Sequence, residues 1–114
     1  MKDIVTFWAR IVSGARGLRA KDKTMKRFLI ERDIPGAGNL SAEQLKGVAA
    51  KSNGVLARLA PKIQWLESFV AANKTFCVYL AESEALVFEH AKLGGFSVTK
   101  VTEVPTVISP MTAY

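Results

Sequence analysis

The order of two hydrophobic periodicities along this chain limits the folds that it can adopt. Residues 26–33 alternate between apolar and polar side chains, a period-two pattern that predicts a strand. Residues 41–59 place apolar side chains three and four positions apart, which predicts a helix with one buried face. The intervening Pro-Gly-Ala-Gly run favours a turn, and Ser-Ala-Glu-Gln at 41–44 has the spacing of a helix capping box. The folded part therefore begins as a strand followed by a helix.

The rest of the chain adds two strands, a second helix and a last strand. Residues 63–72 and 75–81 predict a hairpin. Residues 83–93 predict a helix that two glycines end, and residues 98–108, rich in β-branched side chains, predict the final strand. Because Pro105 cannot donate a ladder hydrogen bond, this strand is expected to lie at an edge of the sheet or to carry a bulge.

This β-α-β-β-α-β order is typical of the α+β ferredoxin-like fold, an antiparallel sheet with two helices on one face. We predict one such domain over residues 25–114. The helices cover only one face of the sheet, so the other face needs a cover, which a second copy of the chain would supply. The expected assembly is a homodimer that pairs through the sheet.

Composition excludes several classes of protein. The 114 residues are 49% hydrophobic and 23% charged, as in a soluble globular domain. No run approaches the ~20 apolar residues of a membrane-spanning helix. The single cysteine, Cys77, cannot form an internal disulfide, and with the single histidine, His90, it cannot make a four-ligand zinc finger. We therefore expect a cytoplasmic protein of one domain.

The net charge of +6 is concentrated near the N-terminus. Residues 1–24 hold six basic and two acidic side chains, whereas residues 25–114 hold ten basic and eight acidic ones. A nucleic-acid-binding protein needs clustered Lys and Arg to displace counterions from phosphates, and the basic residues of the predicted domain are scattered. We predict that nucleic acid is not a partner.

Residues 1–24 are predicted to form a basic amphipathic extension before the domain. On a helical wheel, residues 1–18 gather their apolar side chains in one arc, opposite polar and charged ones. Such a helix is able to make weak contact with an anionic membrane surface. It could equally be an added docking helix or an upstream extension that the domain does not need. No small-residue cleavage site follows a clean hydrophobic core, which argues against a secretory signal.

His90 is the first candidate for a functional residue, since it is the only imidazole in the chain. Helical spacing places it on the sheet-facing side of its helix. If the hairpin loop has two residues, period-two alternation points Glu67 inward beside it. The same assignment turns inward Phe76, Val78 and Leu80. Imidazole and carboxylate together could bind a divalent transition metal or act as an acid–base pair. The alternative is an ordinary buried histidine with one hydrogen bond and a Glu67 that reaches solvent.

Cys77 and Tyr79 share one face of their strand and add a thiol and a phenol to the candidate ligands. A lone strand cysteine is also common as a small buried apolar residue. Further carboxylates, expected at a solvated rim or as a surface acidic pair, are those of Glu31, Asp33 and Glu103. No serine stands in a GxSxG nucleophile pattern, so a serine hydrolase is not expected.

Several runs across the domain resemble one family. They are Phe28-Leu-Ile-Glu-Arg-Asp-Ile-Pro-Gly-Ala-Gly, Leu40-Ser-Ala-Glu-Gln-Leu, Ile63-Gln-Trp-Leu-Glu-Ser-Phe-Val, Phe76-Cys-Val-Tyr and Glu89-His-Ala. The resemblance spans about residues 25–112. It is to a family of small bacterial proteins, grouped as a domain of unknown function, whose best-described type is a dimeric, ferredoxin-like, nickel-binding protein.

The resemblance implies a homodimer that binds nickel or another divalent transition metal, for sequestration or sensing of the metal. Relatives often have histidine at the position of Glu67 and a second histidine at that of His90. Because nickel(II) favours imidazole, the carboxylate is expected to lower nickel affinity and to favour harder ions. The predicted metal ligands are His90, Glu67, Cys77 and Tyr79. The alternative function is a small-molecule enzyme of the dimeric α+β-barrel type that uses His90 with Glu67 or Tyr79. Of the two, we favour a metal-binding protein without enzymatic activity.

Overall fold

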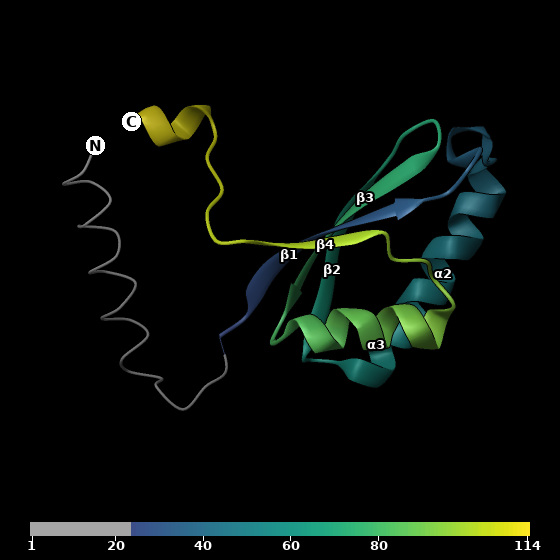
Figure 1. Cartoon of the computed structure of the whole chain (residues 1–114), viewed down its shortest axis with the longest axis horizontal. Coiled ribbons are helices and arrows are strands. Elements are labelled where there is room, and N and C mark those ends of the chain that lie inside the picture. The colour runs from purple at the N-terminus through teal and green to yellow at the C-terminus, as the bar shows by residue number, and fades with distance from the viewer. Residues whose placement is uncertain (1–23) are drawn as a thin grey trace.

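The computed structural model describes residues 24–114 of the chain (Figure 1). Its elements, in chain order, are β1 (Lys26–Asp33), the 3₁₀-helix η1 (Ala37–Asn39), α2 (Ala42–Leu59), β2 (Ile63–Val70), β3 (Lys74–Ala81), α3 (Glu84–Gly94), β4 (Lys100–Val104) and the 3₁₀-helix η2 (Pro110–Ala113). The strands form one antiparallel sheet in the order β2-β3-β1-β4. The predicted α+β ferredoxin-like fold is confirmed.

The capping box predicted for the first helix is present at the start of α2. The Ser41 hydroxyl accepts a hydrogen bond from the backbone N–H of Gln44 at 3.1 Å, and the Gln44 side chain accepts one from the N–H of Ser41 at 2.9 Å. These bonds satisfy amides that the first turn of a helix leaves free. The helix that they start buries Ser52 and Val55.

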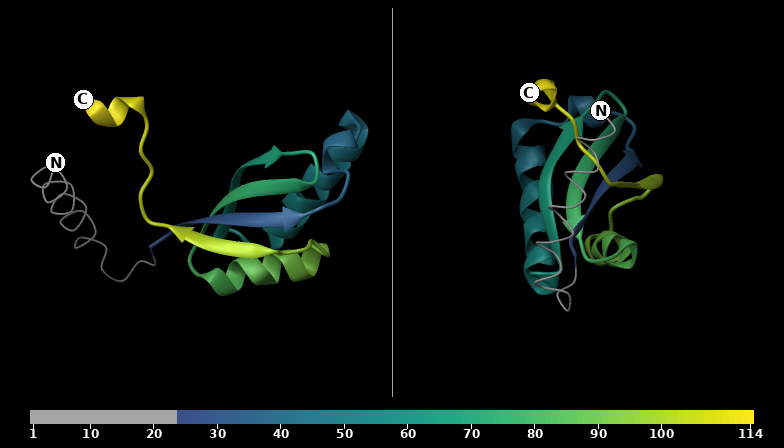
Figure 2. Two further views of the ribbon diagram at one scale, coloured as in Figure 1. Left: turned by 45° about the horizontal axis from the view of Figure 1, so that its top comes forward. Right: turned by 90° about the vertical axis from the view of Figure 1, so that its left-hand side faces the viewer.

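The last strand is shorter than the prediction over residues 98–108. The structure ends β4 at Val104, directly before Pro105. The physical reason is that Pro105 has no N–H to donate, and β1, the pairing partner, itself begins at Lys26. Residues 105–114 leave the sheet and end in η2, away from the body of the domain (Figures 1 and 2).

The core lies between the two helices and one face of the sheet, which we call the inner face. α2 contacts β2, and α3 contacts both β3 and α2 (Figure 2). On the inner face, Phe28 pairs with Tyr79 and Ile30 pairs with Cys77. The buried core consists of Phe28, Ile30, Ile63, Cys77, Tyr79, Ala81 and Val87. We call the other side of the sheet, which neither helix covers, the open face.

A register shift in β2 decides where Glu67 lies. Trp65 pairs with Tyr79 on the inner face, yet Glu67 pairs with Val78, so Leu66 forms a bulge between them. The bulge turns Glu67 to the open face, where it is exposed. Glu67 does share a face with three β3 residues, as expected: Phe76, Val78 and Leu80. That face is the open one, so the prediction that these four side chains point into the core is wrong.

Within residues 24–114, no helix is long and apolar enough to cross a membrane. Apart from Thr24, the amphipathic segment predicted over residues 1–24 lies outside the described residues. Its helix and its membrane contact stay predictions, as does the domain boundary drawn after it.

Candidate functional site

His90 lies in a buried polar cluster between the helices and the inner face of the sheet. Only 1% of its surface is exposed, which confirms that α3 turns it toward the sheet. Its Nε2 lies 3.1 Å from Oγ of Ser52, so the two side chains link α3 to α2. Its ring stacks on Phe96 with centroids 5.4 Å apart, and the ring of Tyr79 tilts against it at 5.1 Å.

The His90 imidazole is neutral at physiological pH. Burial, and then the positive charge of Arg32, lower the pKa of His90 from an ordinary 6.5 to about 4. Its other nitrogen, Nδ1, is buried and has no hydrogen-bond partner among the described residues. A serine hydroxyl can donate or accept. Where Ser52 accepts from the Nε2–H group, Nδ1 carries a bare lone pair and is the atom open to a ligand.

Arg32 brings a cation into the cluster from the inner face of β1. Its side chain is 4% exposed, and Nη1 donates to the backbone carbonyl of Ser97 at 2.6 Å. Nη2 is buried without a partner, and no ion pair joins Arg32 to a carboxylate within residues 24–114. Burial of a charge without a counter-ion is costly, and most buried charges in proteins are paired. Arg32 is therefore the least expected member of this core.

Tyr79 and Cys77 lie on the same face of β3 beside the cluster, as their spacing predicts. Burial raises the pKa of the Tyr79 phenol above its usual 10. The positive charge of Arg32 and hydrogen bonding with the side chains of Ser52 and Arg32 lower it by less. The phenol therefore keeps its proton at neutral pH. The thiol of Cys77 is also buried, and its Sγ lies 3.7 Å from Oγ1 of Thr75.

The four predicted metal ligands do not converge on one point. His90 and Tyr79 are in ring contact and Cys77 is on the same face, whereas Glu67 lies on the open face. In the part of the chain that the structure describes, no three His, Cys, Asp or Glu side chains gather closely enough to hold a metal ion. The cluster around His90 thus offers an imidazole nitrogen, a phenol and a thiol, and it lacks the predicted carboxylate.

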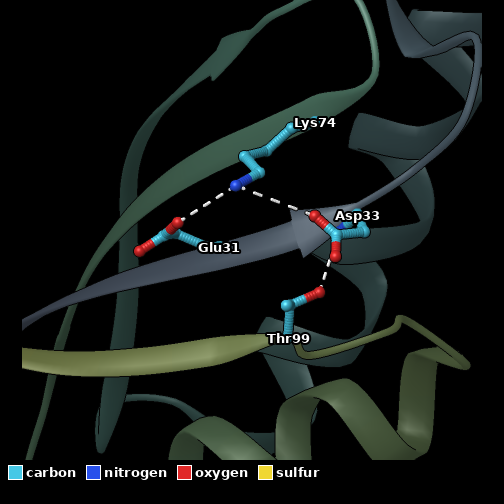
Figure 3. Close-up of polar contacts among 4 residues, drawn as sticks. All are labelled: Glu31, Asp33, Lys74 and Thr99. Carbon is cyan, nitrogen blue, oxygen red and sulfur yellow. Dashed lines mark hydrogen bonds and ion pairs between the residues drawn. The ribbon is translucent and has the colours of Figure 1, made fainter.

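The carboxylates at the end of β1 form a separate surface group (Figure 3). Nζ of Lys74 lies 3.4 Å from Glu31 and 3.8 Å from Asp33, and the backbone N–H of Asp33 donates to Oγ1 of Thr99 at 2.9 Å. Glu103 is exposed and lies opposite Phe28, away from this group. Because Lys74 offsets the negative charge, these carboxylates form an ion-paired rim.

The sequence-based prediction of functional residues missed three members of the cluster, namely Arg32, Ser52 and Phe96. A signal for Arg32 was present, because the period-two pattern of the first strand places this charge on an apolar face. Ser52 similarly stands on the apolar face of its helix. Nothing in the local sequence predicts that Phe96 stacks on His90, since this contact depends on how the loop after α3 folds back.

A metal ion fits this cluster in one respect and conflicts with it in another. Metal-binding histidines usually donate their other ring N–H to an outer-shell partner that orients the ring. Ser52 can serve as that partner at Nε2 of His90, which leaves Nδ1 for the metal. The guanidinium of Arg32 opposes a cation at the same place, because like charges repel strongly where water is excluded. The cluster therefore suits a metal accompanied by an anionic ligand better than a bare divalent ion.

Comparisons with known proteins identify the family. No curated protein matches the sequence. The fold is similar to that in the crystal structure of SCO4226 from Streptomyces coelicolor A3(2), with a TM-score of 0.61 at 15% identity, over 72% of this chain and 99% of that one. A family model described as nickel responsive protein SCO4226-like matches residues 28–104, more than half of the chain. The chain therefore belongs to the SCO4226-like family of nickel responsive proteins.

Proposed function

We propose that this protein binds a divalent transition metal, nickel first among them, through Nδ1 of His90. The family is a nickel responsive one. The observation that carries the proposal is a buried, neutral imidazole with one nitrogen held by Ser52 and the other without a partner in residues 24–114. Nickel(II) favours nitrogen ligands of this kind. The proposed role is sequestration or sensing of the metal.

The other residues of the cluster have separate proposed roles. Ser52 orients the His90 ring, and Tyr79 and Cys77 are the further protein donors on the inner face. A single imidazole makes no closed site, so exogenous ligands must complete the coordination of the metal. Glu67 is not among the ligands of this cluster, because the bulge in β2 places it on the open face.

The small-molecule enzyme considered from the sequence is not favoured by the comparisons. Its acid–base pair of His90 and Glu67 is separated by the sheet within one chain. Tyr79 does contact His90, but burial keeps its phenol protonated and hence a poor base. Metal binding therefore stays ahead of catalysis as the proposal.

The open face is the proposed surface for a second copy of the chain. Its central side chains are apolar and half-buried, namely Leu29, Phe76, Val78 and Leu80, and Phe69 beside them is 54% exposed. Charges of both signs lie at its end, on Lys74, Glu31 and Asp33. An apolar centre with both charges at its rim can match a second copy of itself about a twofold axis.

The C-terminal segment supports the same proposal. Its apolar side chains are strongly exposed, namely Val107, Ile108, Met111 and Tyr114. A hollow lined by Arg27, Leu80, Val104 and Val107 opens where this segment leaves the sheet. Exposed apolar side chains grouped in a segment next to the sheet are typical of a surface that another chain covers.

Calorimetric titration of metal-free protein with the chlorides of nickel, cobalt, zinc and copper tests the metal site. We expect saturable binding to the wild type and loss of most of it in His90→Ala. Glu67→Gln is the matched control, because it removes a predicted ligand that lies on the other face of the sheet. Equal nickel affinity in wild type and His90→Ala would overturn the proposal and place the metal elsewhere.

A further inference from the structure

Two cations approach the same aromatic ring at the edge of the buried cluster. The guanidinium of Arg32 lies 5.4 Å from the centre of the Phe96 ring, and Nζ of Lys51 on α2 lies 5.6 Å from it. Arg32 is buried, Phe96 is half-buried and Lys51 is exposed, so the ring has one buried and one exposed cation beside it. Neither cation forms an ion pair with a carboxylate in residues 24–114. Within this part of the chain, the two positive charges beside the ring are therefore unbalanced.

The hydrogen bonds of Arg32 show which of its atoms lacks a partner. Nη1 is fixed by the carbonyl oxygen of Ser97, in the loop that carries Phe96. Nη2 is buried and no acceptor within residues 24–114 meets the geometry of a hydrogen bond to it, although the guanidinium lies near enough to the Tyr79 phenol to lower its pKa. An unsatisfied buried donor on a charged group costs more than one on a neutral group. An anion at Nη2 would supply the missing acceptor and the missing negative charge together.

We infer that Arg32 and Lys51, beside the ring of Phe96, form a binding site for a small oxyanion carried by a carboxylate or a phosphate group. Nη2 of Arg32 donates to one oxygen of the anion in a charge-assisted hydrogen bond. Lys51, at the exposed end, attracts the anion and contacts its outer side. Because Nη1 already holds Ser97, the anion meets a guanidinium whose orientation is set before binding.

The anion site is separate from the proposed metal site and does not depend on it. The two atoms of the cluster without a partner in residues 24–114, Nη2 of Arg32 and Nδ1 of His90, are both buried. An anion at Arg32 would also lower the repulsion that this cation exerts on a metal at His90. The anion site is nevertheless expected in protein stripped of metal, which separates its test from that of the metal site.

The test is a titration of EDTA-treated protein with sodium acetate and, separately, with sodium phosphate, at constant ionic strength set with sodium chloride. The readout is the set of backbone amide NMR signals of the 15N-labelled full chain. We expect saturable shifts at residues 95–98 and at Arg32. The acetate and phosphate arms decide which oxyanion the site prefers, and saturation in either one supports the site.

Three variants assign the effect to the two cations. Arg32→Met should weaken binding at least about tenfold, the effect of losing a charge-assisted hydrogen bond. Lys51→Ala should weaken binding several-fold. Because Lys51 is exposed, this variant should stay folded and allow the measurement even if Arg32→Met unfolds. Lys46→Ala, an exposed lysine of the same helix, should leave it unchanged. Absence of saturable shifts in both arms, or equal binding by wild type and Lys51→Ala, would overturn the inference.

Discussion

At the residue scale, His90 shows how one buried imidazole can be kept ready for a ligand. Its environment favours the neutral form, first by excluding water and then through the charge of Arg32. Its Nε2 is held by Ser52, and Nδ1 has no partner among the residues that the structure describes. A neutral imidazole with one free nitrogen needs no deprotonation before it binds a metal at neutral pH.

The first prediction concerns pH. In the unfolded chain His90 binds its proton with a pKa near 6.5, whereas in the folded metal-free protein the pKa is about 4. Between these pH values the unfolded state holds more protons than the folded state. The free energy of unfolding therefore falls as the pH falls from 6.5 toward 4. Above pH 6.5 the stabilising contribution of His90 is fully present. The full difference is about 3 kcal/mol. Urea unfolding at several pH values should show this slope in wild type and lose it in His90→Gln; equal slopes would contradict a buried neutral His90.

The second prediction concerns Gly94, on which the Phe96 ring lies. A Cβ at this position would overlap the ring of Phe96. Gly94→Ala should therefore displace the ring from His90 and destabilise the fold by about 1–3 kcal/mol, as overpacking does. Gly54→Ala in α2 is the matched control, because outside its own helix no described atom lies within 4 Å of the added methyl group. It should stabilise by about 0.5–1 kcal/mol. Denaturant unfolding measures both, and a neutral Gly94→Ala would contradict the packing described.

At the scale of the elements, the bulge in β2 separates residues that a regular strand would bring together. Trp65 and Glu67 would share a face at a spacing of two, but the extra Leu66 places them on opposite faces of the sheet. Glu67 then lies on the open face opposite Val78, and His90 lies beneath the inner face. The sheet itself keeps the two apart.

This separation makes the effects of two substitutions independent. Glu67→His should raise nickel affinity by adding an imidazole on the open face, and His90→Ala should remove binding in the cluster. Because the two positions share no partner, the open-face site should have the same nickel affinity in Glu67→His and in the double variant, within about 0.5 kcal/mol. Nickel calorimetry on the four proteins measures this. A coupling well above that value would show that the two side chains bind one ion.

The elements were predictable where short-range patterns decide them. The capping residues Ser41 and Gln44 marked the start of α2, and helical spacing placed His90 against the sheet. The β2 bulge was not predictable, because pairing with β3 decides it and no local residue type announces a register shift. The shortened β4 depended similarly on where its partner β1 begins, although Pro105 marked the place. The contacts of Arg32 with the loop after α3 needed the tertiary fold.

At the scale of the whole molecule, the sheet divides two proposed activities. The inner face holds the buried polar cluster under α2 and α3, and the open face carries apolar side chains that the described chain leaves uncovered. Dimerisation through the open face would leave the cluster of each copy intact. Ligand binding and assembly can therefore be disrupted separately.

Val78→Lys tests assembly alone. Val78 is half-buried at the centre of the open face, so a lysine there would bury a charge in the proposed interface. Sedimentation at micromolar concentration should show two chains for wild type and one for this variant, with unchanged circular dichroism. Val48→Lys, at a 48% exposed site on α2, is the control and should remain dimeric. A wild-type monomer would contradict the proposed dimer.

Metal binding by His90 through Nδ1 can be observed at the atom itself by 15N NMR of the imidazole. The chain contains one histidine, so the spectrum holds a single pair of ring nitrogens. On addition of diamagnetic zinc to the protein treated with EDTA, the Nδ1 shift should change to that of a metal-bound nitrogen, while Nε2 stays protonated and bonded to Ser52. A metal-bound shift at Nε2, or no change at either nitrogen while calorimetry reports binding, would contradict metal binding through Nδ1.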